Sequence, residues 1–242
     1  MGRSAHHGQQ NEGDQFYHRE AELKGSDPQI MKLRLACILT VLALCAFAAA
    51  AQEKTAYSID HAKSKLEINV YKSGLFKAFG HDHLVSAGEI SGRVDFDPQK
   101  IENSSVSMKV VANSLSVMDP GESDKNRGEI QETMRGPQVL DVAKFPEITF
   151  SSTSVSVGKK TAEGWELTVA GKLNLHGVEK PVSLPLQFHV EGDRLVASGE
   201  VFLLQTEYGI TPVTVAGGSV KVKDKLRIGF TIVAMKMKSS SP

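Results

Sequence analysis

Two histidines separated by a single residue, His81 and His83, have a type and spacing that could do chemistry in this sequence. On a β-strand, residues i and i+2 point to the same side, so two imidazoles there could ligate one metal ion. A third ligand would have to come from elsewhere, and the other histidines beyond residue 51 are His61, His176 and His189. The alternative is a pair of hydrogen-bonded histidines in a polar loop or at a strand end. For His176, we favour a hydrogen bond that organises a turn.

No recognisable catalytic motif accompanies these histidines. The sequence has no G-x-S-x-G nucleophile elbow, no H-E-x-x-H zinc motif and no P-loop, and both cysteines lie before residue 51. A Ser/His/Asp grouping could be drawn from His81 or His176 and the many serines, but the sequence supplies no geometry for a triad and we do not favour one. We therefore expect a protein that is not an enzyme and carries no cofactor. A metal-binding protein or metal-dependent enzyme built on His81 and His83 is the alternative.

The charge balance and the cysteine count exclude further classes of protein. The 242 residues include 28 lysines and arginines and 28 aspartates and glutamates, which gives a formal net charge of zero. A nucleic-acid-binding protein usually carries an excess of basic residues, so we expect no nucleic-acid partner. Two cysteines cannot form a disulfide-rich scaffold or a four-cysteine zinc site.

The N-terminal segment has the composition of an export signal preceded by a polar extension. Residues 1–30 have too few apolar side chains to bury a core, so we predict that they are disordered. From Met31 onward, Lys32 and Arg34 precede an apolar run over residues 35–47, which alanines follow. A basic start, an apolar stretch and small residues form the pattern of a secretory signal peptide.

We assign this signal peptide to residues 31–51, with cleavage after Ala51. An uncleaved membrane anchor is the alternative, although the apolar run is short for a transmembrane helix. Because a signal peptide begins its chain, we hypothesise that translation starts at Met31 and that residues 1–30 reflect a mis-assigned start. Residues 52–242 are then one exported domain, in the periplasm or otherwise outside the cytoplasm.

Beyond the signal, apolar and polar residues alternate with the period of β-strands. Glycine, proline and aspartate separate the alternating segments, and long helical patterns are lacking between most of them, which excludes parallel βαβ winding. About eight antiparallel strands are expected, and they could close as a barrel or stack as a sandwich. The segments that we interpret as strands lie near residues 66–70, 94–96, 106–112, 148–157, 167–175, 182–190, 194–206 and 226–234.

One stretch, residues 119–146, breaks the strand pattern and predicts a short helix. Ser123 is a plausible N-cap, and Ile130 and Met134 fall four residues apart on one helical face. Gly136, followed by proline, ends the helix. We expect this helix to cap one end of the barrel.

Several segments together resemble the YceI-like family, whose members are described as lipid- or polyisoprenoid-binding proteins. The resemblance covers about residues 56–235. Its most specific part is residues 171–182 (GKLNLHGVEKPV), and residues 139–150 (VLDVAKFPEITF) resemble a central motif of the family. Residues 57–60 (YSID) and 208–210 (YGI) resemble the family's first strand and its end, whereas the stretch 73–83 departs from the commonest family form.

The resemblance implies an all-β fold, an extended eight-stranded antiparallel lipocalin-like barrel with a short capping helix. It also implies an exported protein whose apolar interior holds a polyisoprenoid, such as an isoprenoid quinone, or a fatty amphiphile, for transport, storage or sequestration. We predict pocket positions from the inward register of the strands, with core packing without ligand contact as the alternative for each. These positions are Ile68, Val70, Phe96, Met108, Val110, Phe150, Leu173, Leu175, Leu186, Phe188, Ile228 and Phe230.

Three points stay open at this stage. His81 and His83 could meet the polar head of a ligand at the barrel mouth instead of a metal ion. The pore could be filled by side chains, in which case the protein would have a structural role in the cell envelope. The lysines at 221, 223 and 225 predict a solvated strand face that could touch a membrane surface transiently, and the chain could be a monomer or a dimer.

Overall fold

The alternating segments form antiparallel strands in the computed structural model, which describes residues 54–73, 82–215 and 220–238. The strands are β1 (Thr55–Ile59), β2 (Lys65–Ser73), β3 (His83–Ala87), β4 (Ile90–Phe96), β5 (Ser105–Val111), β6 (Leu115–Val117), β7 (Glu147–Thr161), β8 (Gly164–Leu175), β9 (Val178–Glu191), β10 (Arg194–Leu204), β11 (Thr214–Val215) and β12 (Val220–Lys236). The helical elements are α2 (Asp124–Arg135) and the short 3-10 helices η2 (Ile101–Asn103), η3 (Ala112–Ser114) and η4 (Gln205–Tyr208).

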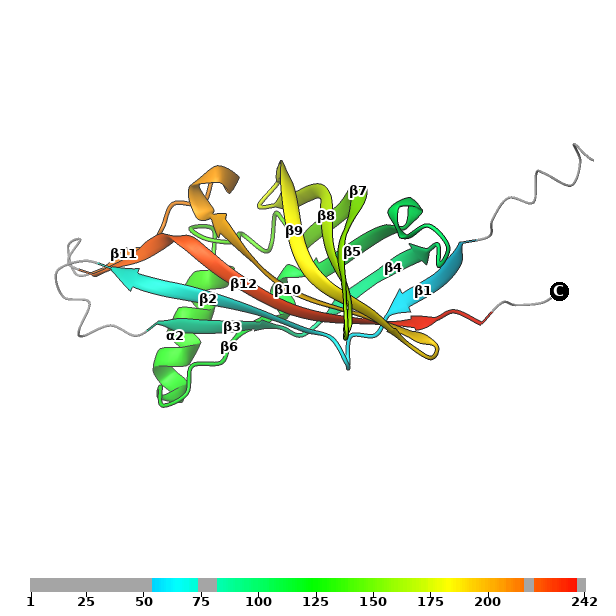
Figure 1. Cartoon of the computed structure of the whole chain (residues 1–242). Helices are drawn as coiled ribbons and strands as arrows, with labels where there is room; N and C mark the ends of the chain where they lie inside the picture. Colours follow the sequence, from blue (N-terminus) through cyan, green and yellow to red (C-terminus); the bar gives the residue numbers. More distant parts are fainter. Residues whose placement is uncertain (1–53, 74–81, 216–219, 239–242) are drawn as a thin grey trace, which may run out of the picture. The chain divides into compact units, whose positions relative to one another are not determined.

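The strands close into a barrel because β12 has neighbours on both of its edges. The ring runs β1, β4, β5, β7, β8, β9, β10 and β12, and β1 pairs with β12 to complete it. The predicted eight-stranded antiparallel barrel is therefore confirmed. In Figure 1, β12 runs along the barrel wall from the β11 end to β1.

Three strands of the ring are broken into two segments each. Both β1 and β2 run antiparallel to β12, with Ile59 opposite Ala234 and Lys65 opposite Thr231. In the same way β3 continues the line of β4, and β6 continues the line of β5. Alternation did not indicate β3 or β6, because segments of five and three residues are too short to show a period.

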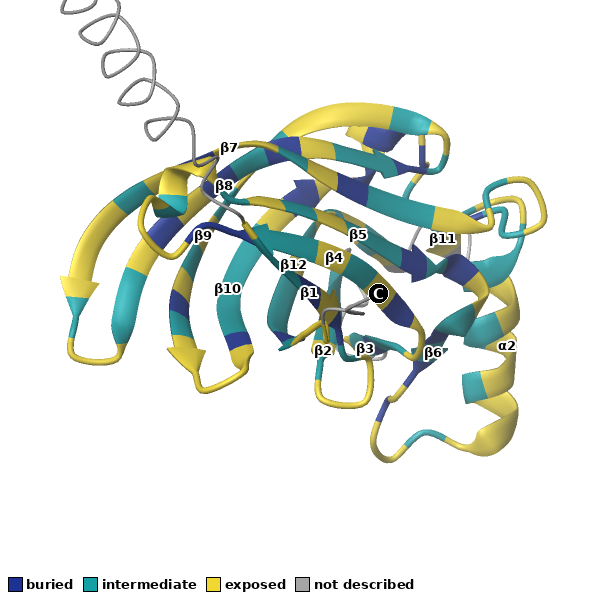
Figure 2. Cartoon of the chain, turned by 90° about the vertical axis from the view of Figure 1, so that its right-hand side faces the viewer, coloured by how far each residue is buried: buried dark blue, intermediate teal, exposed yellow. Residues whose placement is uncertain are grey.

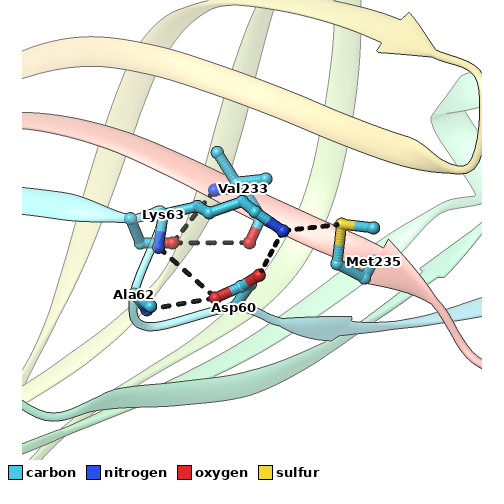
Figure 3. Close-up of polar contacts among 6 residues, drawn as sticks. Asp60, Ala62, Lys63, Val233 and Met235 are labelled. Atoms are coloured by element: carbon cyan, nitrogen blue, oxygen red, sulfur yellow. Dashed lines mark hydrogen bonds and ion pairs between the residues drawn. The ribbon is translucent and has the colours of Figure 1, made fainter.

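A tight turn joins β1 to β2 and is held by one carboxylate (Figure 3). The backbone N–H groups of Ala62 and Lys63 donate to Asp60 Oδ1 at 3.1 and 3.3 Å, and Lys63 Nζ donates to Asp60 Oδ2 at 2.9 Å. The bond from Lys63 is the main reason that the pKa of Asp60 lies below its ordinary value. The Ser64 hydroxyl accepts from the backbone N–H of Val233 at 3.0 Å, which ties the turn to β12.

The predicted helix is confirmed as α2. The Ser123 side chain accepts a hydrogen bond from the backbone N–H of Asn126 at 3.2 Å, and Gly136 is the C-cap residue. The helix lies beside the edge of β6 that is left unpaired by the strands of the described residues. Gln131 accepts from the Val117 N–H at 2.8 Å and donates to the Leu115 carbonyl at 2.7 Å, so its amide stands in for a neighbouring strand.

The strands β7 to β10 form the continuous side of the wall. Figure 2 shows buried and exposed residues following one another along these strands, as expected when one face packs inward. Gly171 on β8 gives room for the Phe150 ring, because a Cβ atom at this position would lie 2.5 Å from it. Val190 was expected to share the inward face of residues 182–188, but it is 40% exposed, so the inward alternation of β9 ends before this position.

Two predicted features lie outside the described residues. The extension over residues 1–30 and the signal peptide over residues 31–51 belong to the part of the chain that the structure does not describe, and so does His81. In the described ranges, no helix has the length and apolar character needed to cross a membrane.

Candidate ligand-binding cavity

The barrel encloses a cavity of about 670 Å³. This volume falls within the range of small-molecule sites, roughly 300–1,000 Å³. Side chains therefore do not fill the whole interior, which favours a ligand site over a pore that is only core. The cavity lies among the inward faces of the strands, and its walls are mainly aliphatic and aromatic.

All of the pocket positions expected from the strand register line this cavity. They are Ile68, Val70, Phe96, Met108, Val110, Phe150, Leu173, Leu175, Leu186, Phe188, Ile228 and Phe230. Contact between these side chains and a ligand stays a prediction. The alternation of apolar and polar residues located them, because residues that face the barrel interior alternate with residues that face outward along each strand.

A bulge in β7 changes which residues of that strand face inward. Before it, Ile148 and Phe150 line the cavity, and after it Val155 does so. The register against β8 shifts between Ser152 and Ser154, where one extra residue is inserted. Because the side-chain period is two, a single extra residue moves the following side chains to the other face. The sequence showed a run of serines and valines here but not the shift in register.

One end of the cavity carries polar side chains, and we call it the polar end. It lies where β2 ends, β3 and β12 begin, and α2 covers β6. Its residues are Tyr71, Lys72, His83, Glu122, Asn126, Glu129, Thr133, Gln205 and Lys221. Among them His83 was predicted at the barrel mouth, whereas the polar residues of α2 were missed.

The helix α2 presents a mixed face to the cavity. Ile130 and Met134, which defined the expected apolar stripe, line it together with Asn126, Glu129 and Thr133. The positions 126, 129, 130, 133 and 134 follow the three- and four-residue spacing of one helical face. This spacing was readable in the sequence, but only the apolar members were taken as inward-facing.

His83 is held by a buried carboxylate. Its Nδ1 lies 2.6 Å from Asp119 Oδ2, and the Asp119 side chain is only 3% exposed. The other oxygen, Asp119 Oδ1, accepts a hydrogen bond from the backbone N–H of Leu84 at 2.7 Å. Asp119 was not singled out from the sequence, because its distance from His83 along the chain hides the contact.

The described part of the structure does not support a metal site at His83. Among residues 54–73, 82–215 and 220–238, no three histidine, cysteine, aspartate or glutamate side chains are grouped so that they could hold a metal ion. His189 pairs with Glu191 at 2.8 Å, and this contact is not part of the cavity wall.

His176 organises a turn, as favoured from the sequence. It adopts a left-handed backbone conformation with φ of 53° at the turn between β8 and β9. Its Nδ1 donates to the backbone carbonyl of Tyr208 at 3.2 Å, and its ring packs edge-on to Phe145 with centroids 4.6 Å apart. Burial, assisted by the charge of Glu207, raises the pKa of the Tyr208 hydroxyl. These contacts join the two sequence motifs that surround residues 145 and 176.

A closed antiparallel barrel around an apolar cavity is the architecture of proteins that enclose one small ligand. A model of the YceI-like domain matches residues 57–234 of the chain, so the chain belongs to the YceI-like family. Curated relatives named Protein YceI from Salmonella arizonae and Salmonella newport are 37% identical to it over 105 residues. The match covers 43% of this chain and 48% of each relative, so it spans about half the length of these relatives.

A solved structure shares the fold. The crystal structure of BcnA from Burkholderia cenocepacia superposes with a TM-score of 0.56, covering 73% of this chain and 99% of BcnA. The two sequences are 22% identical over this match, so the likeness concerns the barrel fold alone.

Proposed function

We propose that this protein binds a long-chain amphiphile, with the apolar chain inside the barrel and the head at the polar end. The observation that carries the proposal is the cavity of about 670 Å³ with its mainly apolar wall. An empty apolar cavity of this size is costly for a barrel to keep, since unfilled volume forfeits packing contacts. A bound chain would restore those contacts.

The physical chemistry of the wall predicts which ligands fit. Burying an apolar chain is worth roughly 0.8 kcal/mol per methylene group, so a long chain binds tightly with few polar contacts. This interaction has no direction, and we therefore expect weak discrimination between chains of similar length. The YceI-like family membership favours a polyisoprenoid, such as an isoprenoid quinone, and supports transport, storage or sequestration rather than a chemical reaction.

The cellular setting is part of the same proposal. We place the working protein outside the cytoplasm after removal of the signal peptide 31–51, where it would meet chains released from a membrane. N-terminal sequencing of the protein from its native source should begin at Gln52. Recovery of residues 1–30 on the native protein would contradict both the export signal and the start at Met31.

The binding proposal is tested by the lipid that the protein carries. Protein purified from its native source without detergent is extracted with organic solvent, and the extract is analysed by mass spectrometry. We expect the extract to contain a polyisoprenoid or fatty amphiphile, at no more than one molecule per protein. The same compound should be absent from a parallel extract of a soluble protein of similar size. Protein that is empty at every step and takes up no added chain would contradict the proposal.

A further inference from the structure

The polar end contains a histidine that is hydrogen-bonded to a buried carboxylate, and this contact determines how its ring can bond to a ligand. His83 lines the cavity and its side chain is 24% exposed, whereas the carboxylate that binds it, Asp119, is almost fully buried. Both oxygens of Asp119 are engaged, one by His83 Nδ1 at 2.6 Å and the other by the backbone N–H of Leu84 at 2.7 Å. The pair therefore has a defined orientation relative to the cavity.

In the neutral imidazole, this arrangement decides which ring nitrogen carries the proton. A carboxylate can only accept hydrogen bonds, so Nδ1 of His83 must be the donor in the 2.6 Å contact. A neutral imidazole with its proton on Nδ1 keeps a lone pair on Nε2. No hydrogen bond joins this Nε2 to another residue in the part of the chain that the structure describes.

We propose that Nε2 of His83 accepts a hydrogen bond from a hydroxyl group on the head of the bound chain. The cavity then prefers alcohols and phenols to ketones and carboxylates, which offer no hydroxyl proton, and among isoprenoid chains it prefers a polyprenol or a quinol to the oxidised quinone. This inference rests on the proposed binding of an amphiphile and names the chemical class of its head.

The charges at the polar end agree with an uncharged head. Lys72 and Lys221 line it together with Glu122 and Glu129, so positive and negative side chains are both present. A site for a carboxylate or phosphate head would be expected to show an excess of cations. Recognition of the head therefore falls to hydrogen bonds.

Substitution of Asp119 by asparagine offers a specific test of the positioning role. An asparagine side chain has one acceptor oxygen, and the Leu84 N–H requires an acceptor at that place. The amide NH₂ then faces Nδ1 of His83 and donates to it, so the ring proton moves to Nε2. Asp119→Asn should thus convert the Nε2 of His83 from an acceptor into a donor without changing the shape of the site.

The experiment compares two probes that differ only in the head, dodecan-1-ol and dodecan-2-one, by displacement of a fluorescent fatty probe from delipidated full-length protein. A hydrogen bond contributes about 0.5–1.5 kcal/mol net, so native protein should bind the alcohol about 2- to 12-fold more tightly. His83→Leu should lower the affinity for the alcohol to that for the ketone. Asp119→Asn should instead raise the affinity for the ketone towards that for the alcohol. His189→Leu, which removes a histidine paired with Glu191 outside the cavity, should leave the ratio unchanged.

Nitrogen-15 NMR of the His83 ring supplies a measurement that does not depend on ligand. We expect a protonated Nδ1 and a pyridine-like Nε2 in native protein, and the reverse in Asp119→Asn. A proton on Nε2 of native protein, equal affinities for the two probes, or tighter binding of dodecanoate that His83→Leu abolishes would each overturn the inference and leave chain binding in place. If native protein binds none of the chains, the proposed function falls, and the inference falls with it.

Discussion

The two sides of the barrel wall are built differently. On one side, β7 to β10 are continuous strands of 15, 12, 14 and 11 residues. On the other side, the three strands of the ring that precede β7 are each broken, and their segments have between three and nine residues. The continuous side is paired along most of its length, whereas the broken side leaves the edge of β6 to be covered by α2.

A site for an amphiphile has to hold an apolar chain and a polar head, and the two sides of the wall suit these two tasks. Continuous strands supply a long apolar surface, since alternation places every second side chain inside. The breaks leave strand ends and a helix against the cavity, and these carry polar side chains such as His83, the first residue of β3, and Asn126 of α2. We infer that the continuous side holds mainly the chain and that the broken side holds the head.

The largest expected effect is a charge placed on the continuous side. Val169 is buried and lines the cavity, while its neighbour Thr168 is exposed on the outer face of β8. Val169→Asp should lower the free energy of unfolding by about 3 kcal/mol and remove the bound chain, because a buried carboxyl group loses its hydration. Thr168→Asp should change stability by about 0.5 kcal/mol or less. Urea denaturation measures the free energy of unfolding, and mass spectrometry of extracted lipid measures the bound chain. Equal losses of stability in Val169→Asp and Thr168→Asp would show that β8 has no inner face.

A second comparison concerns packing within the wall. A Cβ atom at Gly171 would press on the Phe150 ring, whereas no atom lies within 4 Å of the corresponding position at Gly229 on β12. Gly171→Ala should cost about 1–3 kcal/mol in the free energy of unfolding, since overpacking forces the ring or strand to move. Gly229→Ala should be neutral to within about 0.5 kcal/mol. A neutral Gly171→Ala, measured by chemical denaturation, would contradict the close packing of β7 against β8.

The helix that covers the broken side gives a smaller effect. Gln131→Ala removes the amide that bonds the backbone of Val117 and Leu115, and we expect a loss of about 1–2 kcal/mol. Hydrogen exchange of the Val117 amide should become faster, since its acceptor is gone. Glu132→Ala changes the next residue, which is exposed, and should leave that exchange rate unaltered. Unchanged exchange in Gln131→Ala would mean that α2 does not hold the β6 edge.

The smallest effect is expected at the exposed turn between β1 and β2. The hydrogen bond from Lys63 lowers the pKa of Asp60 from its ordinary value of 3.8. The unfolded chain therefore binds this proton more readily, so the carboxylate stabilises the fold above about pH 4 and the contribution is lost as pH falls through the lower, folded pKa. Thermal unfolding between pH 6 and pH 2.5 should show a steeper acid decline for the native protein than for Asp60→Asn. If the stability of both proteins fell equally with decreasing pH, the Asp60 carboxylate would not stabilise the turn.

Local patterns were sufficient for much of the fold. The period of two located the inner residues of β8 and β9 as far as Phe188, and Ser123 and Gly136 located the ends of α2. Such features depend on neighbours within a few residues, so they are visible in the chain itself. The short segments β3 and β6 were missed, because their strand character comes from hydrogen bonds to distant segments rather than from a period.

The candidate site shows the same division. The apolar wall could be predicted from alternation, and His83 could be singled out by its type. Its partner Asp119 lies 36 residues further along the chain, and only the pairing of β3 with β6 brings the two together. The bulge in β7, which restores Val155 to the interior, likewise depends on pairing with β8.

The sequence by itself determined that this chain would form antiparallel strands with one apolar face, a short capped helix and a neutral exterior, because these follow from local periodicity and composition. Closure of the barrel, the volume left empty inside it and the contact between His83 and Asp119 were decided only by the tertiary structure. The physical reason is that each depends on contacts between residues far apart in the chain, and hydrogen bonds and packing of that kind leave no local pattern.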